Sequence, residues 1–152
     1  APFGDAVEVT VEDGTTVGER TPAAYDRILL DAPCTGLGAL RRRPEARWRK
    51  QPSDVAGLGE IQSKLLASAA AALKPGGLLA YVTCSPHLAE TKAIVKAALR
   101  SVPGLAIVPT QPIITAIATD ELDLPEADHV QLWPHRHGTD AMFIQLLTRS
   151  EP

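Results

Sequence analysis

The apolar positions of the chain fall into short runs that predict buried strands. Residues 25–30 and 78–82 each end in an unbroken apolar run that leads into a loop, as strands of a parallel sheet do. Residues 105–108 and 142–147 have the composition of two closing strands. Valines alternate with polar residues over 7–11 before a Glu-Asp-Gly turn, so we expect a further short strand there.

A helix is expected between the first two buried strands. Apolar residues recur at helical spacing from Val55 to Leu73, Ser53 or Asp54 can serve as the N-cap, and the sequence Lys-Pro-Gly-Gly at 74–77 ends the helix. Strands that alternate with helices in this way are typical of an α/β domain with right-handed crossovers and a mostly parallel sheet.

The two cysteines of the chain lie just beyond these two strands, Cys34 after the first and Cys84 after the second. Functional residues of α/β sheets gather at the carboxyl ends of the strands, and strands joined by one crossover are usually neighbours. We therefore expect both thiols to face one crevice. Ser85 as N-cap and Pro86 as first helical residue predict a second helix directly after Cys84, where the helix dipole would favour a thiolate.

Asp31 lies at the end of the first strand, three residues before Cys34. A carboxylate here is either a loop cap or a group that binds and transfers a proton, and each cysteine is either a small buried residue or a nucleophile. Two cysteines at matching strand ends beside an aspartate favour the catalytic interpretation. Without a CxxC pair or a dense cysteine pattern we expect neither a disulfide nor a zinc site, but two thiols in a reducing cytoplasm.

The composition predicts a single globular domain, and the charge distribution indicates a candidate surface for binding nucleic acid. A chain of 152 residues with 45% hydrophobic and 22% charged residues can bury a core as a single domain, which excludes disorder and a coiled coil. The pattern predicts neither a membrane span nor an export signal. The net charge of −3 conceals a basic segment, residues 41–50, which is either a solvated run or a surface for RNA. Its candidate RNA-binding residues are Arg41, Arg42, Arg43, Arg47 and Trp48.

Six sequence features, each present once, follow one another along the chain in an order and spacing that suggest a family. They are DAPCTGLG at 31–38, RRPEARW at 42–48, Gln62, KPGG at 74–77, YVTCS at 81–85 and HGTD at 137–140. Together they resemble the RNA cytosine-5 methyltransferases of the Sun family, and most of all the branch that acts on bacterial ribosomal RNA. The resemblance covers residues 25–143 and is specific because PCT and TCS occur together. It implies a Rossmann-like class I methyltransferase fold, with helices on both faces of the sheet, and S-adenosylmethionine as cofactor.

The resemblance also implies roles for individual residues. Cys84 would attack carbon 6 of the cytosine and so make carbon 5 nucleophilic enough to accept a methyl group. Cys34 would assist removal of the carbon 5 proton and release of the enzyme, and Asp31 would hydrogen-bond the base. Asp13, Asp31 and Pro33 would contact the cofactor, with a simple turn aspartate as the alternative for Asp13.

Some features depart from the family pattern. No glycine-rich cofactor loop precedes residue 25, so the chain resembles the C-terminal part of a methyltransferase domain without its first strands. We therefore expect it to bind the cofactor weakly or not at all by itself. Residues 87–90 read His-Leu-Ala-Glu where the family often has Glu-Asn-Glu, and Ala-Met-Phe at 141–143 replaces Gly-Phe-Phe, which we expect to affect packing more than chemistry.

These patterns support three possible functions. The first is an enzyme that methylates ribosomal RNA in the cytoplasm, without a metal or a membrane. The second is a non-catalytic RNA-binding fragment or paralogue, in which the basic segment binds RNA without chemistry. The third, an amino-methyltransferase of the same fold, is disfavoured because Asp-Ala-Pro-Cys at 31–34 stands where such an enzyme has Asn-Pro-Pro and an aromatic residue.

Overall fold

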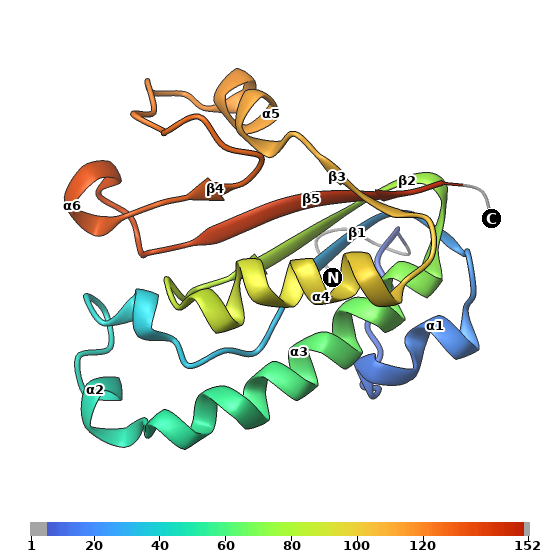
Figure 1. Cartoon of the computed structure of the whole chain (residues 1–152), viewed down its shortest axis with the longest axis horizontal. Helices are drawn as coiled ribbons and strands as arrows, with labels where there is room; N and C mark the ends of the chain where they lie inside the picture. Colours follow the sequence, from blue (N-terminus) through green and yellow to red (C-terminus); the bar gives the residue numbers. More distant parts are fainter. Residues whose placement is uncertain (1–5, 151–152) are drawn as a thin grey trace.

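The computed structural model describes residues 6–150, which form one mixed sheet with helices packed against it (Figure 1). The strands are β1 (Tyr25–Asp31), β2 (Leu73–Thr83), β3 (Leu105–Val108), β4 (Val130–Gln131) and β5 (Phe143–Arg149). The α-helices are α1 (Val17–Arg20), α2 (Ala46–Arg49), α3 (Pro52–Ala72), α4 (Lys92–Ser101), α5 (Thr110–Ile117) and α6 (Pro134–His137). Three 3-10 turns are η2 (Gly14–Thr16), η3 (Leu37–Ala39) and η4 (Leu88–Glu90). No helix among the described residues is long and apolar enough to cross a membrane.

The α/β class is confirmed, but the prediction of a mostly parallel sheet is wrong. The strand order is β1-β2-β5-β3, and β4 also pairs with β5. β1 and β2 are parallel, whereas β5 is antiparallel to β2, β3 and β4. The first four strands thus run one way, as expected of strands joined by crossover helices, and β5 alone runs against them. The short connection through residues 132–142 does not allow the long crossover that a parallel neighbour of β4 would require.

The strand predicted over residues 7–11 does not form. Val9 and Val11 are 86% and 100% exposed, and within residues 6–150 the segment pairs with no other strand. Alternating valines make a strand only where a sheet edge supplies hydrogen-bond partners. In contrast, the helix α5 forms where none was expected. Pro112 lies in its first turn, where N–H groups have no partner within the helix, so the proline does not disrupt it.

α3 and α4 lie side by side against one face of the sheet (Figure 1). On this face, paired residues of adjacent strands lie side by side, and their large apolar side chains form the core with the two helices. The sheet residues of this core are Ile28, Leu30, Leu73, Leu79, Tyr81, Leu105, Phe143 and Leu147. On the opposite face Leu29 of β1 is 74% exposed, so in the described chain no helix covers that part of the sheet, whereas α5 contacts β4 and β5.

The ends of α3 follow local chemistry. Gln51 is the N-cap in place of the predicted Ser53 or Asp54, and Asp54 accepts a hydrogen bond from the Gln51 backbone N–H at 2.9 Å, which closes a capping box. The helix ends at Ala72, just before the Lys-Pro-Gly-Gly sequence. Gly76 in that sequence has a φ of 72°, a conformation that glycine adopts without strain.

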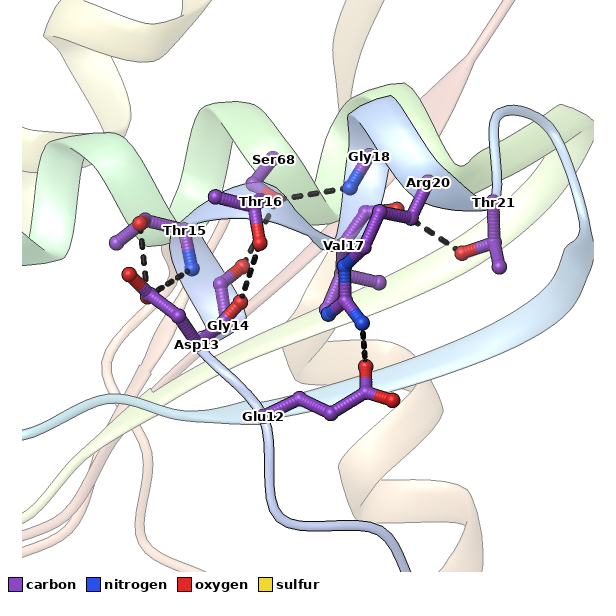
Figure 2. Close-up of polar contacts among 10 residues, drawn as sticks. All are labelled: Glu12, Asp13, Gly14, Thr15, Thr16, Val17, Gly18, Arg20, Thr21 and Ser68. Atoms are coloured by element: carbon purple, nitrogen blue, oxygen red, sulfur yellow. Dashed lines mark hydrogen bonds and ion pairs between the residues drawn. The ribbon is translucent and has the colours of Figure 1, made fainter.

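Ser68 attaches η2 and α1 to the C-terminal part of α3 (Figure 2). Its hydroxyl donates to the Gly14 carbonyl at 2.8 Å and accepts from the Gly18 N–H at 2.9 Å. A Cβ on Gly18 would lie 2.4 Å from the Ser68 carbonyl oxygen and 2.7 Å from the Cβ of Ala71. α1 therefore packs on α3 through a position that has no room for a side chain.

Two glycine substitutions test this packing against simple helix propensity. Gly18→Ala should lower the free energy of unfolding by about 1–3 kcal/mol, because the methyl group forces α1 away from α3. Gly57→Ala should raise it by about 0.5–1 kcal/mol, because this exposed position in α3 has open space around its Cα. Urea unfolding followed by circular dichroism measures both, and a stability change of the same sign in the two variants would contradict this account.

Candidate active site

Three loops meet at the carboxyl ends of β1 and β2. Gly38 lies in the middle, where its N–H donates to the Cys84 carbonyl at 2.9 Å and its carbonyl accepts from the Ala141 N–H at 2.9 Å. A Cβ on Gly38 would lie 2.1 Å from the Ala141 oxygen and 2.8 Å from the Cys84 oxygen. The DAPCTGLG, YVTCS and HGTD motifs are thus joined through backbone atoms at a glycine.

The prediction that the two thiols face one crevice is confirmed. The Sγ atoms of Cys34 and Cys84 are 3.3 Å apart, and both side chains are half-buried and unoxidised. Burial, and secondarily the hydrogen bond with Cys84, raises the pKa of the Cys34 thiol to about 12. Cys34 therefore stays protonated at neutral pH.

The prediction of a helix directly after Cys84 is wrong. η4 begins at Leu88 and α4 only at Lys92, so no helix N-terminus follows the thiol. Ser85 does not cap a helix. Its hydroxyl instead donates to the buried carboxylate of Glu90 at 2.6 Å and accepts from the His87 N–H at 3.1 Å.

Glu90 is a central residue of the site that the sequence analysis missed. Its side chain is fully buried and accepts hydrogen bonds from the Thr35 N–H at 2.7 Å, the Thr35 hydroxyl at 2.6 Å and the Ser85 hydroxyl at 2.6 Å. The amide of Gln62 in α3 lies 3.4 Å from the same carboxylate and donates to the Pro33 carbonyl at 2.8 Å. An acidic residue between apolar positions of an expected helix face was the signal available in the sequence.

A pocket of about 410 Å³ opens over the two thiols. Asp31 and Pro33 lie on its wall with both cysteines, while Arg43 and Lys50 add positive charge. Asp31 is exposed at the end of β1, so its carboxylate is available to a ligand. The structure thus brings the three predicted catalytic residues together, and Asp31 and Pro33 can form one side of a cofactor site.

Asp13 is not among the residues that line this pocket. Its carboxylate accepts from the N–H and the hydroxyl of Thr15, at 2.9 and 2.8 Å, and caps η2. These bonds lower the pKa of Asp13. Among the described residues, the contacts of Asp13 are those of a turn aspartate, the alternative to a cofactor contact.

The residues of the basic segment have different surroundings. Nε and Nη2 of Arg42 lie 2.7 and 2.5 Å from Oδ2 of Asp140, a carboxylate that is only 7% exposed. Arg42 thereby lowers the pKa of Asp140, with a weaker contribution from Arg41 at 4.0 Å. Arg43 faces the thiol pocket, and Trp48 is 81% exposed. Arg42 is thus the member of the segment that supports the fold.

A second pocket of about 420 Å³ adjoins the first through Thr35 and Lys50, and Arg47 lies on it. The helix α6 ends at His137, the first residue of the HGTD sequence. His137 at the end of α6 accepts a hydrogen bond from the Trp133 N–H at 2.9 Å. Among the described residues no group of three His, Cys, Asp or Glu side chains could hold a metal ion.

Known proteins are similar to this chain in sequence and in fold. Residues 4–148 match the family model described as 16S rRNA methyltransferase RsmB/F. The protein MT1451 of Mycobacterium tuberculosis (strain CDC 1551 / Oshkosh) is 58% identical over 125 residues, which are 82% of this chain and 26% of that protein. Ribosomal RNA small subunit methyltransferase B of Vibrio cholerae is 43% identical over 88 residues, 58% of this chain and 20% of that protein.

A solved structure extends the match to the fold. NSun6 from Pyrococcus horikoshii, solved with SFG, superposes with a TM-score of 0.78 and 26% identity, over 97% of this chain and 36% of that one. The chain spans about a quarter of the length of the curated relatives it matches. From its sequence motifs, its fold and these matches, the chain belongs to the RsmB/F (Sun) family of 16S rRNA methyltransferases.

Proposed function

We propose that this chain supplies the covalent machinery by which a longer protein methylates carbon 5 of a cytosine in ribosomal RNA. The observation that carries the proposal is the pair of thiols, 3.3 Å apart, in a pocket that also holds Asp31. A ring carbon is a poor nucleophile until covalent addition breaks the aromatic system, and a thiolate is the side chain best suited to that addition.

In the proposed reaction Cys84 is the nucleophile. The Cys84 thiol first loses its proton to solvent. Its sulfur then bonds to carbon 6, while the electron pair of the 5,6 double bond moves to carbon 5 and into the ring, where Asp31 hydrogen-bonds the base. S-adenosylmethionine, when bound, supplies the methyl group that carbon 5 accepts. Loss of the carbon 5 proton then restores the double bond as the bond to Cys84 breaks.

Cys34 suits the second half of this reaction. Its raised pKa makes it a poor source of thiolate for attack. Once its own proton has passed to solvent, the resulting thiolate is a strong base that can accept the proton from carbon 5. The 3.3 Å separation places that sulfur next to the bond that must break. Removal of the carbon 5 proton is therefore the role that we assign to Cys34.

We also propose that the longer protein continues the sheet beyond β1 and completes the cofactor site there. β1 is an edge strand within the described residues, and Leu29 on it is exposed. A largely apolar pocket of about 330 Å³ follows this edge and reaches Gly14, the neighbour of Asp13. For the chain alone, its exposed arginines support RNA binding without catalysis.

The roles of the two thiols can be separated in the longer protein. Cys84→Ala should abolish methylation and any covalent adduct with RNA, because no other group bonds to carbon 6. Cys34→Ala should leave attack intact and stall release, so an adduct should accumulate. A denaturing gel with labelled ribosomal RNA and cofactor detects it. Adduct from Cys84→Ala, or none from Cys34→Ala despite normal RNA binding, would reject this assignment.

The arginines can be tested by the salt dependence of RNA binding. Arg43→Gln and Arg47→Gln should each reduce the slope of log affinity against log salt by roughly 0.7, the value for one lost single-strand phosphate contact. The losses should be similar for RNAs of different sequence. A loss that depends on sequence, with an unchanged slope, would mean that these side chains read bases.

Arg42→Gln is the contrasting variant in the same series. It should lower the melting temperature at neutral pH, because the buried Asp140 carboxylate loses its partner. The pKa of Asp140 is depressed in the folded state, so the ion pair stabilises above the ordinary value of 3.8. The difference in melting temperature from the unsubstituted protein should therefore shrink as the pH falls below 3.8.

A further inference from the structure

We propose that Glu90 is a positioning residue that sets the distance between the two thiols by holding the hydroxyl residue that follows each cysteine. Thr35 follows Cys34 and Ser85 follows Cys84. Both hydroxyls donate to the same carboxylate oxygen, Oε2 of Glu90, at 2.6 Å. The third residues of the PCT and TCS motifs thus meet on one atom.

The contacts are those of a rigid junction. Thr35, Ser85 and Glu90 have exposed fractions of 2%, 0% and 0%, so water does not compete for these hydrogen bonds. Bonds to a charged acceptor in a dry environment are short and strong. Oε1 holds the Thr35 N–H at 2.7 Å, which fixes the backbone as well as the side chain next to Cys34.

Glu90 is itself fixed from the opposite side. Its carbonyl accepts a hydrogen bond from the Tyr81 hydroxyl at 2.8 Å, and Tyr81 is a fully buried residue of β2. Gln62 of α3 lies 3.4 Å from the carboxylate and also holds the Pro33 carbonyl. Through these contacts the Glu90 carboxylate has a fixed position relative to the sheet and α3, and it fixes both cysteine loops in turn.

A carboxylate suits this task better than a neutral side chain. It only accepts hydrogen bonds, so both hydroxyls must point their protons toward it and neither can turn away to another acceptor. An amide in its place presents one oxygen and one donor group. If that oxygen takes the place of Oε2, the amide NH2 group faces the Thr35 N–H and the bond between them is lost. If the NH2 group takes that place instead, neither hydroxyl can donate to it. Glu90→Gln therefore changes the relative placement of the loops in either orientation.

The first test measures the distance between the thiols through their oxidation in the longer protein. Diamide takes two electrons and two protons from the thiols as the sulfur–sulfur bond forms, and peptide mapping by mass spectrometry follows the disulfide between Cys34 and Cys84. Thr35→Val and Ser85→Ala, each of which removes one hydroxyl, should slow its formation by about tenfold to 100-fold, as expected for a displacement near 1 Å. Thr35→Ser, which keeps the hydroxyl, should restore the rate.

The second test rests on the proposed function and uses methylation. Glu90→Gln should lower kcat by about 100-fold with little change in KM for RNA, because the thiols act in the reaction and not in RNA binding. Glu60→Gln, an exposed glutamate of α3, is the matched control and should leave both constants unchanged. Urea unfolding of each variant identifies any that does not fold. If Glu90→Gln does not fold, the kcat and KM of Ser85→Ala, the smallest of these changes, test the positioning role in its place.

The outcomes separate the two proposals. Rates of disulfide formation in Thr35→Val and Ser85→Ala equal to that of the unsubstituted protein would overturn the role of Glu90, whatever the reaction. A slowed disulfide in a longer protein that does not methylate ribosomal RNA would support the role of Glu90 and reject the proposed function. A raised KM with unchanged kcat in Glu90→Gln would also overturn the positioning role.

Discussion

The close approach of three loops at Gly38 is the constraint on which the site depends. A backbone N–H and a carbonyl of one residue join loops that come from distant parts of the chain, and a methyl group would overlap both neighbouring oxygens. Each such bond contributes only about 0.5–1.5 kcal/mol net. Their importance is geometric, because they place Cys84 against the loop that carries Cys34.

The sequence was informative where local pattern and tertiary structure agree. The apolar runs located β1, β2 and β3, and crossover logic placed both cysteines at one edge of the sheet. It could not give the direction of β5, because the composition of a buried strand is the same in either direction. The antiparallel arrangement follows from the short connection after β4, a property of the chain path rather than of the residues in the strand.

Ser85 shows how a local signal can be overridden. Ser-Pro is a good helix start, yet the Ser85 hydroxyl donates to the buried Glu90 carboxylate while it accepts from the His87 N–H, and no helix begins at Pro86. The buried Glu90 carboxylate needs donors, and an unpaired buried charge costs more than a missing cap. Arg42 likewise looks like its neighbours in sequence, and only the folded chain brings it to Asp140.

The open edge of β1 has a practical consequence for the chain studied by itself. Its free backbone groups and the exposed Leu29 beside them form a template on which another extended segment can pair. In the longer protein that we propose, further polypeptide would cover this edge, whereas in a concentrated solution of the chain the available partner is a second copy. Edge-to-edge pairing of two copies is therefore the route to aggregation that the described sheet leaves open.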